Sequence, residues 1–396
     1  MSQVNFVALG PLLLVACVVA IVTRRVGFPY AVGLVLAGIG LNVAGYRSRI
    51  ELTPELLFKF VLPPLIFEAA LRTEWRQFRR EAPLVLTLAF AGTFLSALVV
   101  AAGMHWLLGW AWQAAFLFGS LIAATDPVSV IAIMKEQKAE ERLRFIMEAE
   151  SLVNDGVAAV LFALCVIAIQ GAAAPPSAIG ASLLWIVLGG VLCGLAVAGA
   201  LLLIAGRSDD HLVELTLTVL AAYGSFAIAE RFNASGILAT LSAGMLIGNW
   251  GRGRTITERG GEAIIRFWDF AAFLANSIIF ILIGGREANQ SFSAYLFAAA
   301  VAIALALAGR AVAIYPLSTL FARSPLAIRG MARHLLFWGG LRGALALALA
   351  LAAPAMLPEH DALIGAAFAV VAFSIFVQGL TVPSLLRRWD MLAEEA

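Results

Sequence analysis

Long apolar segments follow one another through almost the whole chain, and they constrain its fold more than any other feature. A helix that crosses the hydrocarbon core of a bilayer needs about 20 mostly apolar residues. About thirteen such segments can be drawn, over 4–22, 28–45, 53–71, 83–108, 112–134, 147–170, 178–206, 212–229, 235–250, 262–284, 292–321, 330–353 and 362–386. The sequence therefore predicts an all-α polytopic membrane protein.

The composition excludes several classes of protein. Hydrophobic residues make up 62% of the chain and charged residues 13%, whereas soluble domains have about 45–50% and about 25%. A soluble enzyme and a disordered protein are both excluded. Lys and Arg number 27 against 25 Asp and Glu, with no basic block to bind nucleic acid. The phosphate-binding motif G-x-x-x-x-G-K-[ST] does not occur, which argues against transport driven by ATP hydrolysis.

The distribution of basic residues predicts the orientation. If the N-terminus is outside, nineteen Lys and Arg residues fall in the regions on the cytoplasmic side and four fall in the outer loops. Cytoplasmic loops are enriched in Lys and Arg. We therefore expect a multi-pass protein of the cell membrane with its N-terminus outside and its C-terminus in the cytoplasm.

Six ionisable residues lie near the middle of predicted spans. They are Glu68, Asp126, Glu150, Asp155, Arg310 and Arg342. Each such group costs at least about 2.5–3.5 kcal/mol to insert in a membrane. A single buried charge could belong to a structural ion pair, but six such charges in one chain indicate an ion pathway. The acids outnumber the bases by four to two, so a bound cation or protons must neutralise the remainder.

The sequence Thr125-Asp126-Pro127 predicts a break in the fifth span. Pro127 has no N–H and collides with the carbonyl one turn earlier, and the residue before a proline is pushed out of helical geometry. We expect one half-helix to end near 123–124 and a second to start at Pro127, capped by Asp126. Carbonyl groups freed in this way need a cavity or a ligand, and oxygen ligands suit a hard cation. An ordinary proline kink is the alternative.

The sixth span carries Glu150, Ser151, Asn154 and Asp155. Ser151 and Asp155 are four residues apart and share a helix face, with Asn154 beside them. Glu150 diverges from Asp155 by about 140°. We therefore expect Ser151 and Asp155 to face a cation, and Glu150 to need a buried cation of its own, for which Arg310 is the candidate.

Three glycines surround Arg342 in Gly339-Gly340-Leu341-Arg342-Gly343. They predict a second broken helix, whose exposed carbonyl groups a guanidinium would neutralise; close packing of helices is the alternative reading. Glu68 follows a Pro63-Pro64 kink by about one turn, a weaker signal.

The two breaks occupy matching positions if the chain contains two repeats. We predict a first six-helix repeat at 1–177, a linker helix at 178–210, a second repeat at 211–386 and a short cytoplasmic tail at 387–396. Interrupted helices at matching positions of inverted repeats point to a transporter's substrate site.

Four stretches resemble the NhaP-type monovalent cation/proton antiporters, the branch that includes the animal sodium/hydrogen exchangers. The matching sequences are F-E-A-A at 67–70, A-T-D-P at 124–127, E-S-L-V-N-D-G at 150–156 and G-L-R-G-A at 340–344. The resemblance implies a homodimer of thirteen-helix protomers, each with two crossed broken helices. We expect no cofactor and no enzymatic activity.

The resemblance also assigns roles to residues. It places the ion site at Asp155, Asp126, Ser151, the Thr125 main chain and Glu68, with Asn154 beside Asp155. It implies a structural ion pair of Glu150 with Arg310, and charge compensation in the broken helix by Arg342. An Asn-Asp pair in place of Asp-Asp marks the electroneutral branch of the family.

The expected function is antiport of Na⁺ or Li⁺ against H⁺, in which Asp155 holds either a cation or a proton. A K⁺/H⁺ antiporter and a sodium-coupled solute symporter remain as alternatives, although few further polar groups are present for an organic solute. A cation channel would need rings of charge. An intramembrane protease would use Asp126 and Asp155, but the sequence lacks its motifs.

Overall fold

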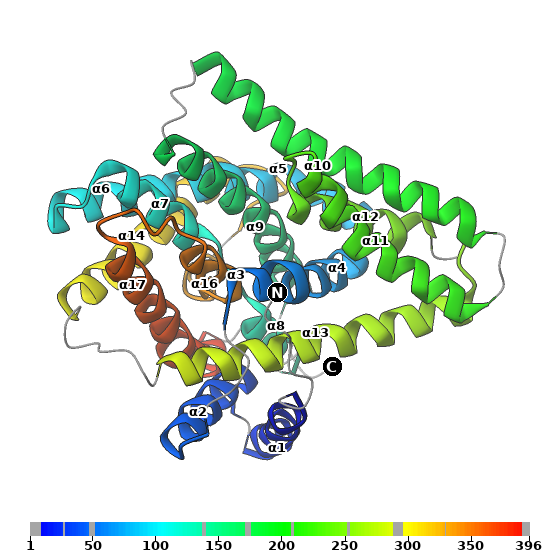
Figure 1. Ribbon diagram of the computed structural model, residues 1–396, viewed down its shortest axis with the longest axis horizontal. Coiled ribbons are helices and arrows are strands. Elements are labelled where there is room, and N and C mark those ends of the chain that lie inside the picture. Colours follow the sequence, from blue (N-terminus) through cyan, green and yellow to red (C-terminus); the bar gives the residue numbers. More distant parts are fainter. Residues whose placement is uncertain are drawn as a thin grey trace. The chain divides into compact units, whose positions relative to one another are not determined.

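The computed structural model describes residues 9–26, 28–46, 52–136, 140–170, 176–206, 210–251, 254–287, 296–328 and 330–389 (Figure 1). Every regular element in these ranges is a helix, which confirms the predicted all-α fold class. The predicted tail at 387–396 lies outside the described residues from 390 onward.

The first half of the chain contains α1 (Leu9–Val26), α2 (Tyr30–Val43), α3 (Pro54–Leu56), α4 (Leu62–Arg72), α5 (Trp75–Leu86), α6 (Thr93–Leu108), α7 (Trp112–Ala123), α8 (Val128–Glu136), α9 (Glu141–Ile169) and α10 (Pro176–Ala205). The second half contains α11 (His211–Arg231), α12 (Gly236–Leu246), α13 (Glu258–Glu287), α14 (Leu296–Leu320), α15 (Ala332–Trp338), α16 (Ala344–Leu351), α17 (His360–Phe373) and α18 (Gly379–Arg388). Short π-helical stretches are η2 (Leu57–Val61), η3 (Thr87–Gly92), η4 (Ile247–Gly251) and η6 (Ser374–Gln378).

Nine helical segments of the described residues are long and apolar enough to cross a membrane. The predicted total of about thirteen is not confirmed, because four predicted spans are short or interrupted. The span predicted at 28–45 appears as the shorter helix α2. The span predicted at 53–71 is divided among α3, η2 and α4. The span at 235–250 consists of α12 followed by η4, and the span at 330–353 consists of the separate helices α15 and α16.

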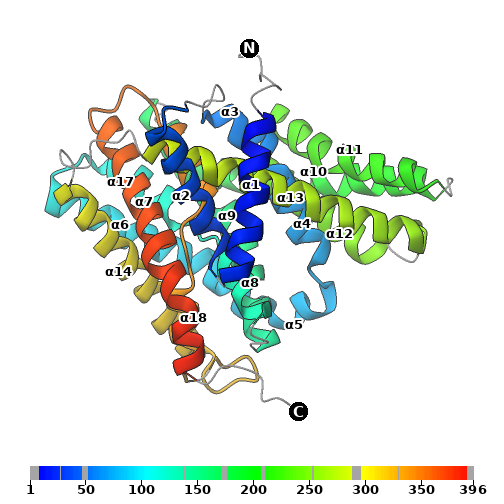
Figure 2. The ribbon, with the colours of Figure 1, turned by 90° about the horizontal axis from the view of Figure 1, so that it is seen from below.

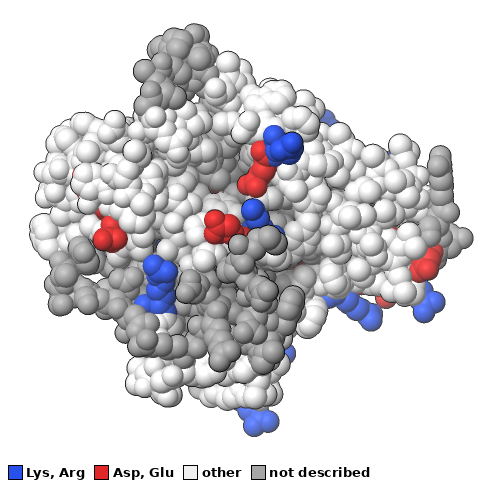
Figure 3. All heavy atoms as spheres, viewed as in Figure 1, with Lys and Arg blue, Asp and Glu red and all other residues white. Residues whose placement is uncertain are grey.

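The surface is mostly uncharged, as expected for a protein surrounded by lipid. Charged side chains are few and scattered on the face drawn in Figure 3. Large apolar side chains such as Leu184, Leu192 and Leu203 of α10 are more than half exposed. In a soluble protein such helices would aggregate, whereas lipid tails solvate them without cost.

The chain divides into two compact units that do not follow the order of the sequence. The first unit contains Met1–Leu57, Leu84–Asn154 and Asn276–Ala396, and the second contains Phe58–Pro83 and Asp155–Ala275. The predicted repeats at 1–177 and 211–386 are a separate matter of internal symmetry and stay a prediction.

In the first unit, small residues allow helices to pack closely. Figure 2 shows α6, α7, α14 and α17 side by side. A Cβ atom on Gly119 of α7 would lie 2.3 Å from the carbonyl oxygen of Ala97 on α6. An apolar core that includes Leu84, Val130, Ile314 and Leu335 holds the ends of α5, α8, α14 and α15 together.

In the second unit, α10, α11 and α12 pack side by side, as Figures 1 and 2 both show. A Cβ atom on Gly194 of α10 would lie 2.1 Å from the carbonyl oxygen of Ala239 on α12. Phe67 of α4 contacts Trp268 of α13 with ring centroids 4.5 Å apart, and both side chains are fully buried.

Candidate functional site

The first break lies where Pro127 predicts it. Helix α7 ends at Ala123, the next four residues are not helical, and α8 begins at Val128. The carboxylate of Asp126 accepts a hydrogen bond from the N–H of Val128 at 3.1 Å, and thus caps α8. The break therefore presents the oxygen atoms of Thr125 and Asp126 at the junction of two half-helices.

The second break lies between α15 and α16. Gly339–Gly343 separate the two short helices, and the carbonyl oxygen of Leu341 accepts a hydrogen bond from the N–H of Asp126 at 2.8 Å. The two interrupted helices therefore meet at their breaks. A Cβ atom on Gly343 would lie 2.3 Å from Oδ2 of Asp126, so only glycine leaves room for this carboxylate.

Arg342 compensates the first broken helix. Its Nη1 donates to the carbonyl oxygen of Ala124 at 2.8 Å, and the side chain is buried. The sequence predicted a second broken helix whose carbonyl groups a guanidinium would neutralise. The structure instead directs Arg342 to the carbonyl that the other break frees at the C-terminal end of α7. Because the breaks cross, a cation on one can satisfy the partial negative charge of the other.

Two polar side chains of helix α9 form hydrogen bonds with the first break. Asn154 donates from Nδ2 to the Thr125 hydroxyl at 2.7 Å, and its Oδ1 accepts from the Thr125 N–H at 3.4 Å. The Ser151 hydroxyl donates to the Thr125 carbonyl oxygen. All three side chains are buried. Both polar atoms of the Asn154 amide therefore help to position Thr125.

Glu150 and Arg310 form a buried ion pair. Nη1 and Nη2 of Arg310 donate to the two carboxylate oxygens of Glu150 at 2.7 and 2.8 Å. Nδ2 of Asn154 also donates to Glu150, at 3.1 Å, and Arg310 donates to the carbonyl oxygen of Leu336 at 3.1 Å. One polar network thus joins α9, α14 and α15 to the first break.

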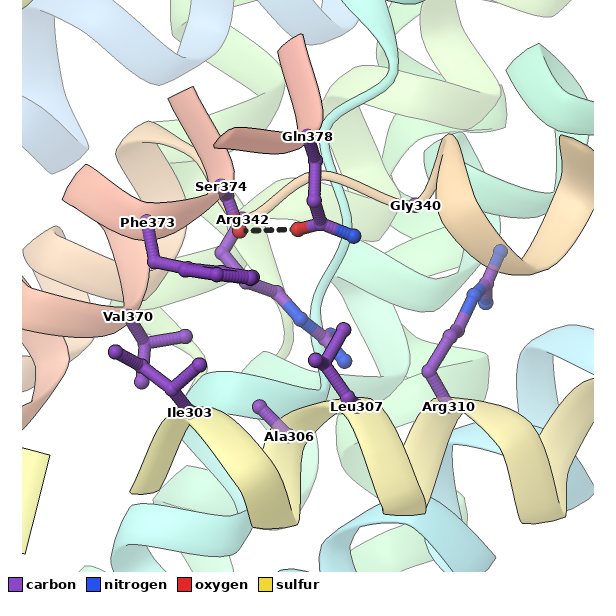
Figure 4. A pocket seen from close by; sticks show the side chains of 10 residues that line it. All are labelled: Ile303, Ala306, Leu307, Arg310, Gly340, Arg342, Val370, Phe373, Ser374 and Gln378. Atoms are coloured by element: carbon purple, nitrogen blue, oxygen red, sulfur yellow. Dashed lines mark hydrogen bonds between the residues drawn. The ribbon is translucent and has the colours of Figure 1, made fainter. Parts of the chain in front are cut away.

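Both buried arginines line a small cavity of about 10 Å³ (Figure 4). Gln378 closes it, accepting from the Ser374 hydroxyl at 2.8 Å and donating to the carbonyl oxygen of Trp338 at 3.0 Å. Gln378 and Ser374 were not among the predicted site residues, because an amide in an apolar span carries no charge to draw attention to it. They hold the end of α15 in place beside Arg342.

Asp155 is the next residue on α9 after Asn154. The helix runs uninterrupted over Glu141–Ile169, so Asp155 lies on the same side of it as Ser151, four residues earlier. The side chains of Asp155 and Asp126 are both partly exposed, in contrast to the buried Glu150. The sequence predicts both carboxylates as ion ligands, and neither is as deeply buried as Glu150.

Glu68 belongs to the second unit and is paired there. Its carboxylate accepts from Nε of Arg72, one turn later on α4, at 2.5 Å. The same guanidinium binds Asp269 of α13. The spacing of four residues between Glu68 and Arg72 is a sequence signal for this pair, which the predicted roles did not include.

A further buried acid was missed in the second unit. Glu214 of α11 is only 1% exposed, and its carboxylate accepts from the N–H of Thr257 at 2.9 Å and from the Thr257 hydroxyl at 3.0 Å. A negative charge before the N-terminus of α13 is favourable. Glu214 lies close to a predicted span end, which is why it did not stand out, and its contacts give it a structural role.

If Asp126 is a sodium ligand, as the sequence predicts, replacing Gly343 with Ala should weaken sodium binding. The new methyl group would displace the Asp126 carboxylate, and a shift of about 1 Å disables a positioned site. We expect the apparent KM for Na⁺ in proteoliposomes to rise roughly tenfold or more. Gly224→Ala is the matched control, because nothing lies within 4 Å of its added Cβ. An unchanged KM for Na⁺ in Gly343→Ala would show that Asp126 is not a sodium ligand.

Comparison with known proteins agrees with this architecture. Residues 13–388 match the family model described as "Sodium/hydrogen exchanger, transmembrane". The low-affinity Na⁺/H⁺ antiporter NhaS1 of Synechocystis sp. is 36% identical over 373 residues, which cover 93% of this chain and 71% of that protein. The Na⁺/H⁺ antiporter NhaH of Halobacillus aidingensis is 32% identical over 397 residues, 97% of each chain. The structure of the sodium proton antiporter MjNhaP1 from Methanocaldococcus jannaschii has the same fold, with a TM-score of 0.77 and 19% identity over 98% of this chain and 97% of that one.

Proposed function

Because the chain belongs to the sodium/hydrogen exchanger family, we propose that it exchanges Na⁺ for H⁺ across the membrane. Relatives that align with nearly the whole chain carry this activity in their names. The observation that carries the proposal is the crossing of two broken helices, which presents Asp126 and Thr125 beside a helix that also carries Ser151 and Asp155. Neither solute symport nor K⁺/H⁺ exchange is favoured by the relatives.

Asp155 and Asp126 are the proposed ion-binding carboxylates. Ser151 and Thr125 supply hydroxyl and main-chain oxygens, which are hard ligands that suit Na⁺. In the proposed mechanism one carboxylate oxygen cannot hold Na⁺ and a proton together, so either ion displaces the other. Glu68 is a further candidate ligand, available once it is released from Arg72.

The charges of the network favour exchange of one Na⁺ for one H⁺. Glu150 is neutralised by Arg310. Glu68 is paired with Arg72, and Arg342 offsets one of the two carboxylates, Asp126 and Asp155, which leaves a single negative charge. One Na⁺ or one proton cancels that charge, and each half of the cycle then carries the same charge across the membrane. We propose electroneutral exchange on this basis, by alternating access of the carboxylates to the two sides.

We also propose the membrane, the orientation and the oligomeric state of the exchanger, and a second substrate. The excess of basic residues on one side supports a cell-membrane protein with its N-terminus outside and its C-terminus in the cytoplasm. The family resemblance supports a homodimer. Li⁺, which is smaller than Na⁺ and prefers the same oxygen ligands, is expected as a second substrate.

Sodium and proton should compete in a transport assay. We expect the apparent KM for Na⁺ to fall as the pH rises, by roughly tenfold per pH unit where protons saturate the site, with the maximal rate little changed. Dissipation of a pH gradient in proteoliposomes, on adding Na⁺, Li⁺ or K⁺, measures this. Clamping the membrane potential should leave the rate unchanged. A KM for Na⁺ that is independent of pH would contradict a shared site.

A further inference from the structure

The second unit contains a cavity that the proposed transport mechanism does not use. It measures about 410 Å³ and is lined by Glu74, Trp75, Arg76, Asn249, Trp250 and Arg254. The first three residues form the turn from α4 into the start of α5, which can be followed in Figure 2. The others come from η4 and the residues just after it.

Asn249 fixes the two walls of the cavity to each other. Its Oδ1 accepts from the N–H of Trp75 at 2.6 Å, and its Nδ2 donates to the carbonyl oxygens of Thr73 and Met245 at 2.9 and 2.8 Å. A Cβ atom on Gly248 would lie 2.3 Å from the carbonyl oxygen of Leu71, so η4 and the end of α4 are in direct backbone contact. The walls are therefore pre-formed and do not need a ligand to assemble.

The position of the cavity places it at the membrane boundary. The segment Trp75–Leu108 has 34 residues, and about 20 suffice to cross the hydrocarbon core. Its first turns carry the exposed side chains of Arg76, Arg79 and Arg80 and therefore extend beyond that core. Trp75 packs against Trp250 with ring centroids 5.7 Å apart, and tryptophan is enriched at the level of the lipid headgroups.

The charge of the cavity favours an anion. Arg76 and Arg254 are exposed, and neither forms an ion pair with any residue that the structure describes. Glu74 is also in the lining and opposes an anion, which leaves a net charge of one positive unit. A guanidinium binds phosphate oxygens through a planar fork of N–H donors. Two guanidinium groups beside two indole rings match a phosphate that is attached to an apolar chain.

We propose that this cavity binds the phosphate headgroup of an anionic phospholipid, held by Arg76 and Arg254. The indole rings of Trp75 and Trp250 contact the glycerol and the first acyl carbons. The predicted orientation places the cavity in the cytoplasmic leaflet, where anionic lipids concentrate. A soluble phosphate offers the same oxygens but has no apolar part for the indole rings.

Crosslinking to a lipid probe tests this directly. The full chain is reconstituted in phosphatidylcholine vesicles that contain a trace of photoactivatable phosphatidylglycerol, and crosslinks are mapped by mass spectrometry. We expect crosslinks at 74–76 and 249–254. In Arg76→Gln/Arg254→Gln their yield should fall roughly tenfold or more, because the phosphate loses both of its hydrogen-bonding guanidinium groups. Glu74→Gln should raise the yield.

The control variant Arg79→Gln/Arg80→Gln loses the same charge from α5 outside the cavity and should change the yield little. Equal loss in both double variants, or equal crosslinking by a phosphatidylcholine probe, would overturn the proposal. Displacement of the probe by an equal concentration of inorganic phosphate would assign the cavity to soluble phosphate and overturn the lipid assignment. If the Arg76/Arg254 variant is unstable, a lower yield in Glu74→Gln contradicts the proposal by itself. None of these readouts depends on transport.

Discussion

Proteoliposomes that contain the Asp155→Asn variant are expected to show no sodium-dependent proton movement above that of protein-free vesicles. Asn keeps the size and shape of Asp but cannot bind a proton or carry a negative charge. If Asp155 is the group that Na⁺ and H⁺ occupy in turn, neither half of the cycle can proceed. The measurement is the dissipation of an imposed pH gradient after addition of Na⁺ and of Li⁺.

Glu141→Gln is the control for this experiment. It removes one acid from the same helix, α9, at a position where the side chain is 82% exposed, and should leave the flux unchanged. Thermal unfolding of both purified variants separates a transport defect from a folding defect. Sodium-dependent proton flux that persists in folded Asp155→Asn would assign the exchange to other groups.

The largest loss of stability is expected from Arg310→Gln. It leaves the carboxylate of Glu150 buried without its cation, and breaking one side of a buried pair costs about 3–5 kcal/mol. The carbonyl oxygen of Leu336 also loses its hydrogen bond from Arg310. We expect a large fall in the thermal unfolding midpoint of the purified protein.

The double variant Glu150→Gln/Arg310→Gln should recover most of that stability, because removing both charges costs far less than orphaning one. Arg266→Gln is the matched surface control. Arg266 pairs with Glu262 at 3.4 Å, with side chains 81% and 73% exposed, and such pairs contribute about 0–1 kcal/mol. A midpoint for Arg310→Gln as high as that of Arg266→Gln would contradict the structural role of the buried pair.

The helix breaks were predictable because their causes are local. Pro127 removes a donor and restrains Asp126, so the end of α7 at Ala123 and the cap on α8 both follow from three adjacent residues. The glycines from Gly339 to Gly343 predicted the second interruption in the same way. The helix count was less secure, because π-helical stretches and short half-helices such as α15 and α16 leave no separate signal in an apolar sequence.

The partners of the buried charges were only partly predictable. Counting charges suggested Arg310 for Glu150, and the structure contains that pair. Arg342 was expected to serve its own helix, but it binds the carbonyl of Ala124, 218 residues earlier in the chain. Such a contact depends on how two distant segments cross. The pair of Arg72 with Asp269, 197 residues apart in the chain, was unpredictable for the same reason.

The division into two units could not be read from the sequence at all. The first unit combines three separate stretches of chain and the second combines two. Helix–helix packing among Ala, Gly and Leu leaves no pattern that says which apolar helix neighbours which. The close approaches at Gly119 and Gly194 became interpretable only once the partner helices were known.

Competition between one cation and one proton for the same carboxylates is the central claim. Calorimetric titration of the purified protein with Na⁺, repeated in buffers of different ionisation enthalpy, measures the protons released per Na⁺ bound. We predict the release of close to one proton per sodium ion at a pH where the site is protonated, and no release in Asp155→Asn. Sodium binding that releases no proton at any pH would contradict the claim.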